Sequence, residues 1–395
     1  MAAPARVALA MPGSVRLEAL PPLSLYVHMP WCVRKCPYCD FNSHEQKGDL
    51  PEDAYCTSLV ADLEHALPWI WGRRVSSIFF GGGTPSLFSA RSIDSLLSEF
   101  RSRLNIAADA EITLVANPGT FEAGKFRDFR ASGINRLSIG IQSFNDAHLK
   151  ALGRIHSADE ARRAIEIAQS SFENINLDLM YGLPGQSAGE ARADMEEGIR
   201  WGTPHLSAYQ LTLEPNTVFY RHRPQLPEHD AAAAMQEVAE ALLDGAGFEH
   251  YETSAFSKPG MRCRHNTNYW QFGDYLGLGA GAHGKVSFAD RIERHARARQ
   301  PREYMALAAA GRSIVEQKAV APAELPFEFM LNALRLVEGF PAALFRERTG
   351  LELTAVDAAL AKGEALGLLE RDWQRIRPTV RGQRFLNELL ALFLP

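Results

Sequence analysis

Short runs of β-branched and aromatic residues alternate with longer segments of helical periodicity through the first 220 residues. Six such alternations predict βα units around a parallel sheet. Six parallel strands with helices outside form either an open doubly wound sheet or an incomplete barrel, and the pattern alone does not choose between them. The predicted strands are residues 24–28, 77–80, 111–116, 136–141, 174–180 and 206–211.

Polar or glycine-rich sequence follows each predicted strand. In barrel enzymes the working residues collect at the carboxyl ends of the strands, so these segments are expected to share one rim. The segments, in chain order, are HMPWCVRKCPYC, GGGTP, ANPGT, GIQSF, YGLPGQ and TLEPNT.

The alternation stops near residue 221. A predicted helix over 229–243 leads to a glycine-dense segment, RCRHNTNYWQFGDYLGLGAGAHGK, and then to an arginine-rich stretch over 291–310 that is predicted to be helical. The tail predicts three helices and a hairpin turning near Arg371 and Asp372, an order typical of winged-helix domains. The predicted parts are a leader (1–22), the βα region (23–220), an extension (221–320) and a winged-helix-like domain (321–395).

The leader has an apolar patch but is too short and too interrupted by proline to span a membrane, and it lacks a convincing cleavage site. It is expected to be flexible.

Composition narrows the class of protein. The 395 residues are 46% apolar and 23% charged, which is typical of a globular chain with a large core. A net charge of -5 gives no basic footprint for nucleic acid, and the arginines between Arg371 and Arg384 are interpreted as a solvated hairpin. Five cysteines, three of them within eight residues, argue against a disulfide framework and predict a reducing, cytoplasmic setting.

The segment CVRKCPYC places three thiols on one loop, at Cys32, Cys36 and Cys39. Three thiolates at this spacing can hold a four-iron, four-sulfur cluster and leave one iron without a protein ligand. An open metal position is where substrate binding or catalysis occurs. The alternatives are a Cys3His zinc site completed by His28 or His44, and a fourth thiolate from Cys56 or Cys263.

The C-x3-C-x2-C motif after a first strand, with GGGTP after the next, resembles the radical S-adenosylmethionine superfamily. The resemblance implies an incomplete six-stranded βα barrel, a [4Fe-4S] cluster, and S-adenosylmethionine bound through the open iron. Over nearly the whole chain, further motifs resemble the coproporphyrinogen-dehydrogenase branch of that superfamily. They are YVHMPWCVRKCPYCDFNSH, ANPGT, RLSIGIQSFND, LGR, NLDLMYGLPGQ and HNTNYW.

Two departures from the dehydrogenase favour the HemW family of haem chaperones within that branch. The dehydrogenase has a further cysteine two residues after the third, where this chain has Phe41, and HNTNYW is similar to the HNxxYW signature of HemW. In that signature the histidine, here His265, is the haem-linked residue. A lone histidine in a loop is more often structural, but Tyr269 and Trp270 beside it offer flat faces to a porphyrin. His283 is a second candidate haem ligand.

The resemblance also implies a set of cofactor contacts. The glycines let the backbone approach a ligand closely, and Arg154 is suited to hold a carboxylate. For each polar contact the alternative is an ordinary ion pair at the rim. The implied residues are Tyr26, Tyr38, Gly82, Gly83, Thr84, Gln142, Arg154, Asp178 and Thr212. One position departs from the family, because Val115 stands where a glutamate contacts S-adenosylmethionine.

Two functions follow from the resemblance. One is a chaperone that binds haem and delivers it to client haemoproteins; the other is oxygen-independent coproporphyrinogen III dehydrogenase, which decarboxylates its substrate through a 5'-deoxyadenosyl radical. Phe41, Val115 and HNTNYW favour the chaperone, without dehydrogenase activity. A one-electron donor is an implied partner, and peripheral contact with a membrane is left open. A purely structural metalloprotein is a third alternative.

Overall fold

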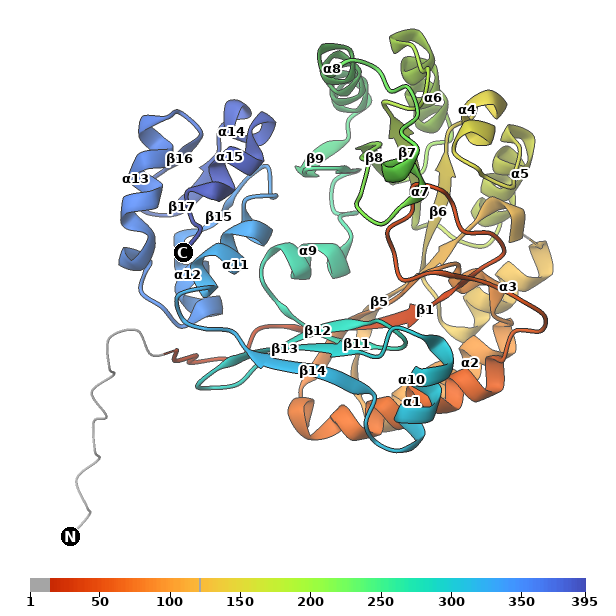
Figure 1. The fold of residues 1–395 in the computed structure, drawn as a ribbon, viewed down its shortest axis with the longest axis horizontal. Coiled ribbons are helices and arrows are strands. Elements are labelled where there is room, and N and C mark those ends of the chain that lie inside the picture. The colour runs from red at the N-terminus through yellow and green to blue at the C-terminus, as the bar shows by residue number, and fades with distance from the viewer. Residues whose placement is uncertain (1–14, 121) are drawn as a thin grey trace.

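A computed structural model describes residues 15–120 and 122–395, and its centre is a sheet of twelve strands (Figure 1). The six predicted strands are confirmed, each within three residues of its expected bounds except β5, which begins six residues earlier. They are neighbours in chain order, and each runs parallel to the next. They are β1 (Leu23–Met29), β4 (Arg74–Gly82), β5 (Asn105–Ala116), β6 (Arg136–Gln142), β7 (Ile175–Tyr181) and β8 (His205–Gln210).

Both edges of this parallel set are extended by later parts of the chain. β11 (Asp274–Leu278) pairs parallel with β1, and antiparallel strands follow it. The remaining strands of the sheet are β12 (His283–Ser287), β13 (Ile292–Arg297) and β14 (Ile314–Ala319) beyond β11, and β10 (Ala255–Ser257) and β9 (Glu249–Glu252) beyond β8.

The prediction of a helix over 291–310 is wrong for the first half of that stretch, which forms β13. The second half forms α10 (Pro301–Ala309). Arginines on an exposed helix would face solvent. Arg297 is instead buried with its Nε against Asp62, and His295 is buried beside Glu293, so both side chains face carboxylates inside the protein rather than solvent.

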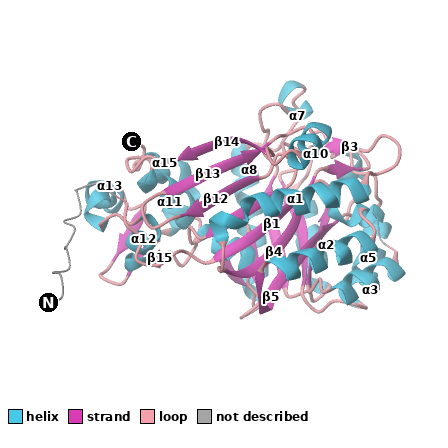
Figure 2. Cartoon of the chain, turned by 90° about the horizontal axis from the view of Figure 1, so that it is seen from below, coloured by secondary structure: helices cyan, strands magenta, loops and turns pink. Residues whose placement is uncertain are grey.

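Helices cover the outer face of the parallel strands (Figure 2). Alternate apolar residues of the strands, such as Leu25 and Ile78, form one core with Leu59 and Leu63 of the first helix. Serine capping boxes start α5 and α6, which fixes where these helices begin. The helices are α1 (Glu52–Ile70), α2 (Ala90–Arg103), α3 (Ala123–Ser132), α4 (Asp146–Ala151), α5 (Ala158–Gln169), α6 (Ala188–Arg200) and α8 (His229–Gly245).

The inner face of the same strands is polar. Successive side chains of a strand point to opposite faces, so the residues between the outward apolar ones face inward. In barrel enzymes branched apolar side chains usually fill this space, whereas here polar groups line it and leave a cavity. The inward residues include Ser24, Tyr26, Ser77, Glu111, Thr113, Arg136, Ser138, Asn176, Asp178, His205, Ser207 and Tyr209.

A second core lies in the C-terminal part, built around Phe329, Phe340 and Phe345. The predicted hairpin is present, with β16 (Leu369–Arg371) paired antiparallel to β17 (Arg375–Pro378). β15 (Phe340–Pro341) completes a small sheet. The helices of this part are α11 (Leu325–Ala333), α12 (Ala342–Thr349), α13 (Asp357–Ala365), α14 (Val380–Arg384) and α15 (Leu386–Ala391).

The predicted flexible leader differs in its last residues. Leu17 is buried in the second core and its backbone N–H donates to the carbonyl of Ala289 at 3.0 Å, so the chain is packed from there on. Residues 1–14 lie outside the described residues. Among the helices of the described residues, none is both long enough and apolar enough to cross a membrane.

Candidate functional site

A cavity of about 480 Å³ extends from the cysteine loop to the amino-terminal end of β6. The loop follows β1 and is braced by a short parallel pair, β2 (Trp31–Cys32) with β3 (His44–Glu45). Segments after β4, β5 and β6 also line the cavity, as expected for a shared rim. The segments YGLPGQ and TLEPNT contribute no lining residue.

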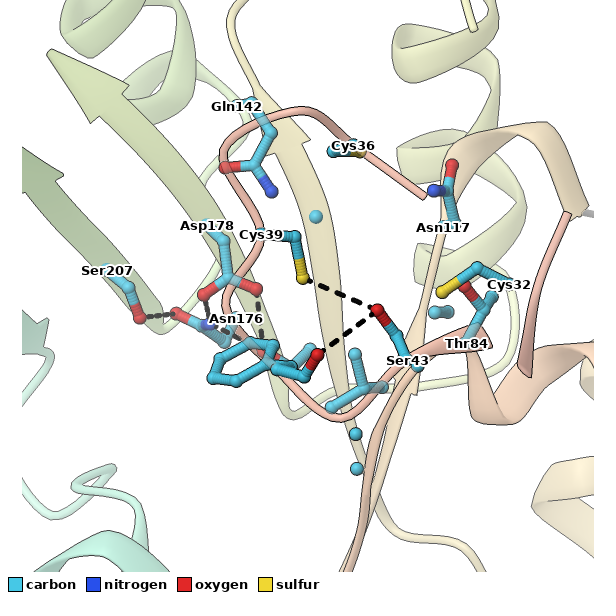
Figure 3. A pocket seen from close by; sticks show the side chains of 18 of the residues that line it. Cys32, Cys36, Cys39, Ser43, Thr84, Asn117, Gln142, Asn176, Asp178 and Ser207 are labelled. Atoms are coloured by element: carbon cyan, nitrogen blue, oxygen red, sulfur yellow. Dashed lines mark hydrogen bonds between the residues drawn. The ribbon is translucent and has the colours of Figure 1, made fainter. Parts of the chain in front are cut away.

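The three cysteines of the loop line this cavity and are free thiols (Figure 3). The Cys36 sulfur lies 3.6 Å from an Arg154 nitrogen, and the Cys39 sulfur lies 3.7 Å from the Ser43 hydroxyl. Burial raises the pKa of the Cys32 and Cys39 thiols. Binding of a cationic metal centre would therefore release protons from them.

Within the described residues, no group of three or more His, Cys, Asp and Glu side chains is arranged to hold a metal ion. Figure 3 accordingly shows the three cysteine side chains at separate places around the cavity. Three thiols on one loop at the mouth of one cavity are nevertheless the donors that a [4Fe-4S] cluster requires, so the residues present fit this group in number and kind.

Of the two histidines that could complete a Cys3His zinc site, one is already hydrogen-bonded at both ring nitrogens. His28 uses both ring nitrogens, one with the Tyr26 hydroxyl at 3.0 Å and the other with the carbonyl of Asn42 at 2.9 Å. Cys56, on α1, and Cys263, buried beside Glu111 at the start of the helix Arg264–Trp270, do not line the cavity. His44 does not line the cavity either, so among the candidate metal ligands the three loop cysteines alone line it within the described residues.

Gly82 and Gly83 lie at the end of β4, where the chain passes close to β1. A Cβ on Gly82, whose φ is +107°, would lie 2.6 Å from the His28 ring, and one on Gly83 would lie 2.5 Å from the carbonyl oxygen of Trp31. Both glycines are required by this packing, and both line the cavity with Thr84.

Gln142 and Arg154 lie at the rim. Gln142 has a φ of 71°, a left-handed conformation that is rare outside glycine and is concentrated at functional sites. The oxygen of its side-chain amide accepts a hydrogen bond from the Tyr209 hydroxyl at 2.7 Å. Arg154 donates to the carbonyl of Gly140 at 2.7 Å, which holds its guanidinium beside Cys36.

Asp178 lies deeper, on β7, and accepts hydrogen bonds from Ser138 at 3.0 Å and Asn176 at 2.8 Å. Burial raises the pKa of Asp178, while these hydrogen bonds oppose the shift. Tyr26 and Tyr38 also line the cavity. The structure thus brings together most of the predicted cofactor contacts.

Three predicted residues do not line the cavity. The exposed Thr212 follows β8 and donates to the Glu214 carboxylate at 2.8 Å, and the exposed His283 begins β12. His265 lies in α9 (Arg264–Trp270), is 7% exposed, and hydrogen-bonds Ser77 at 3.2 Å. Its ring stacks on Phe79 at 4.9 Å between centroids. Burial lowers the pKa of His265 to about 3, so the imidazole is neutral at pH 7.

Glu111 positions α9 and was not singled out from the sequence. Its carboxylate accepts the backbone N–H groups of Arg264 and His265, both at 3.1 Å, which satisfies free donors at the start of the helix. Asn268 of the same helix donates to Ser24 at 2.9 Å. Alternation of polar and apolar residues in every strand was the signal for this inward layer.

Known protein families and proteins of similar sequence agree with this architecture. Residues 26–197 match the family model "Radical SAM superfamily", and residues 320–385 match "HemN C-terminal domain". "Heme chaperone HemW" of Escherichia coli is 50% identical over 377 residues, covering 95% of this chain and 99% of that protein. "Heme chaperone HemW" of Haemophilus influenzae is 48% identical over 384 residues, covering 96% and 99%. This chain belongs to the HemW family.

A solved structure of coproporphyrinogen III oxidase (HemN) from Escherichia coli, described as a radical SAM enzyme, superposes on this chain with a TM-score of 0.81. The match covers 95% of this chain and 90% of the other at 22% identity, so it shows the fold alone. The HemW family member described here is therefore an α/β protein of radical SAM type with a large, mostly parallel sheet.

Val115, on β5, lines the cavity, so a side chain at this position can contact a bound ligand directly. A valine accepts no hydrogen bond, whereas a glutamate there would accept from an ammonium or hydroxyl group. We expect Val115→Glu to bind S-adenosylmethionine about tenfold more tightly, the effect of one charged hydrogen bond. Anaerobic calorimetric titration of the cluster-loaded protein measures the affinity. Val115→Gln is the neutral control, and equal affinities for all three proteins would contradict the expectation.

Proposed function

We propose that this chain is a haem chaperone, which binds haem and delivers it to client haemoproteins. The observation that carries the proposal is the identity of 50%, over nearly the full length of both chains, with a protein named for that role. Phe41 adds to it, since a 63% exposed phenylalanine stands where the dehydrogenase has its further cysteine.

A [4Fe-4S] cluster on Cys32, Cys36 and Cys39, with S-adenosylmethionine, belongs to the proposal. When bound, the cluster supplies an open iron and one-electron chemistry, which requires an electron donor. Around it the chain's own residues would hold the ligand: Arg154 presents a guanidinium beside the thiols, and Asp178 presents a buried carboxylate. The cavity residues proposed as contacts are Tyr26, Tyr38, Gly82, Gly83, Thr84 and Gln142.

For the architecture we infer an incomplete barrel of six parallel strands over residues 23–220, an extension to 320 and a winged-helix-like unit from 321. The polar inner face closed by α9 supports the incomplete barrel, and the small sheet with its hairpin supports the winged-helix-like unit. A cytoplasmic site of action is part of the same proposal.

Oxygen-independent coproporphyrinogen III dehydrogenase is the second candidate. The motifs that resemble the coproporphyrinogen-dehydrogenase branch favour it, together with a cavity that the three cysteines line. One assay separates the two functions: the anaerobically reconstituted protein is incubated with coproporphyrinogen III, S-adenosylmethionine and dithionite. We expect no decarboxylated product, and turnover would overturn the chaperone proposal.

For haem we expect His265→Ala to change the Soret band of the haem complex, because a neutral imidazole is a normal axial ligand to haem iron. In this structure His265 is bound to Ser77, so ligation would require α9 to shift. His283→Ala is the matched variant, since His283 is exposed. A titration in which neither variant alters the spectrum would remove both residues as ligands, whereas a change in only one would identify the ligand.

A further inference from the structure

The closed end of the cavity holds a buried arginine that the cofactor contacts do not use. Arg136 is the first residue of β6, is 2% exposed, and lines the cavity. Its Nε has no hydrogen-bond partner, and within the described residues the guanidinium takes part in no ion pair. A buried guanidinium normally has partners, because removing it from water is costly.

The acidic groups nearest to Arg136 are committed elsewhere. The Glu111 carboxylate accepts the backbone N–H groups that start α9, and Asp178 accepts from Asn176 and Ser138. Burial opposes the charged form of Arg136, but nearby groups, Cys263 and Glu111 foremost, raise its pKa. The guanidinium therefore stays charged and faces a cavity with its hydrogen-bonding capacity unused.

Arg136 is separate from the arginine at the rim. Gly140, which holds Arg154, is four residues further along β6, about 13 Å at the usual rise of a strand. Arg154 is therefore held at the Cys36 end of the cavity, and Arg136 belongs to the other end of the same strand. Asn266 of α9 lines the same cavity and offers a side-chain amide as a second polar group.

We propose that Arg136, with Asn266, forms a carboxylate-binding subsite at the closed end of the cavity. A guanidinium pairs with a carboxylate through two parallel hydrogen bonds, which matches the unused donors. The carboxylate comes either from a propionate arm of a tetrapyrrole or from a small free carboxylic acid. The first source rests on the proposed haem function, and the second does not.

Affinity measurements distinguish the sources. Cluster-loaded protein, saturated with S-adenosylmethionine throughout, is titrated with iron protoporphyrin IX and with its dimethyl ester. If a propionate binds, wild type prefers the diacid by about tenfold or more, the effect of one charged hydrogen bond. Arg136→Met then binds both forms with the affinity of the ester, and Arg136→Lys lies between. If a small acid binds, succinate at about 10 mM raises the melting temperature of wild type but not of Arg136→Met, because a ligand that binds only the folded state stabilises it.

A stability measurement separates this role from a structural one. Among the described residues Arg136 has no hydrogen bond or ion pair to lose, so ligand-free Arg136→Met should melt close to the wild-type temperature. Arg297→Met is the matched control: it removes an equally buried arginine that pairs with Asp62, and it should melt lower.

Two outcomes overturn the subsite: equal affinity for diacid and ester together with no effect of succinate, or a lowered melting temperature of ligand-free Arg136→Met. The first leaves the haem proposal intact if both porphyrins bind. Conversely, a succinate effect that depends on Arg136, without any haem binding, supports the subsite and overturns the haem function.

Discussion

Replacing Cys36 with alanine should reduce the iron content of anaerobically reconstituted protein from about four atoms per chain to near zero, with loss of the cluster absorbance. Two remaining thiolates leave two irons without protein ligands, and neither Cys56 nor Cys263 lines the cavity to substitute. Cys32→Ala and Cys39→Ala should behave alike, because all three thiols line the same cavity.

The matched control for this prediction is Cys56→Ala. Cys56 lies on α1 with its sulfur 4.0 Å from the carbonyl of Ser92, and it does not line the cavity. It should keep full iron and sulfide content. A Cys36→Ala protein that retains four irons, or a Cys56→Ala protein that loses them, would contradict the ligand assignment.

Replacing Asp62 with alanine should lower the free energy of unfolding by on the order of 3–5 kcal/mol, the usual cost of leaving a buried charge unpaired. Asp62 is fully buried on α1 and accepts hydrogen bonds from Tyr304 at 2.9 Å and Ser313 at 2.7 Å. It also lies 3.4 Å from the Nε of Arg297 on β13. One carboxylate thus ties α1, β13 and α10 together. Denaturant unfolding of the cluster-free protein measures the change.

A double variant tests the cause of this loss. Asp62→Leu combined with Arg297→Met removes both charges, so it should recover much of the stability lost in Asp62→Ala. Asp53→Ala is the surface control on the same helix and should change stability by less than about 0.5 kcal/mol. A cost below about 1 kcal/mol for Asp62→Ala would show that the pair is not what holds these elements.

The strands were predictable because their apolar residues stand in short runs, a pattern that is visible in the sequence. In the structure these residues form the core that the helices cover. Residues 136–141, for example, read as a strand from their own pattern, and β6 spans Arg136–Gln142. The stretch 291–310 was not predictable in the same way. Its arginines resemble a solvated helix, and only the position of Asp62, far away in sequence, makes a buried strand position possible for Arg297.

The site likewise has features that the sequence predicted and features that it did not. Three cysteines on one short loop form a local pattern, so spacing was enough to predict a metal-binding segment and its resemblance to a superfamily. His265 also belongs to a local motif, but its burial against Ser77 and Phe79 depends on β4, which comes much earlier in the chain. The motif therefore indicated importance without indicating accessibility.

The sequence by itself determined the parallel strands, the thiol loop and the family, since each depends on the order and spacing of nearby residues. Only the tertiary structure decided that the inner face of the sheet is a polar cavity closed by α9, with Arg136 at its end and no carboxylate paired to it within residues 15–120 and 122–395. The physical reason is that burial and pairing of charges depend on groups from distant strands, whose meeting is fixed by packing rather than by any local pattern.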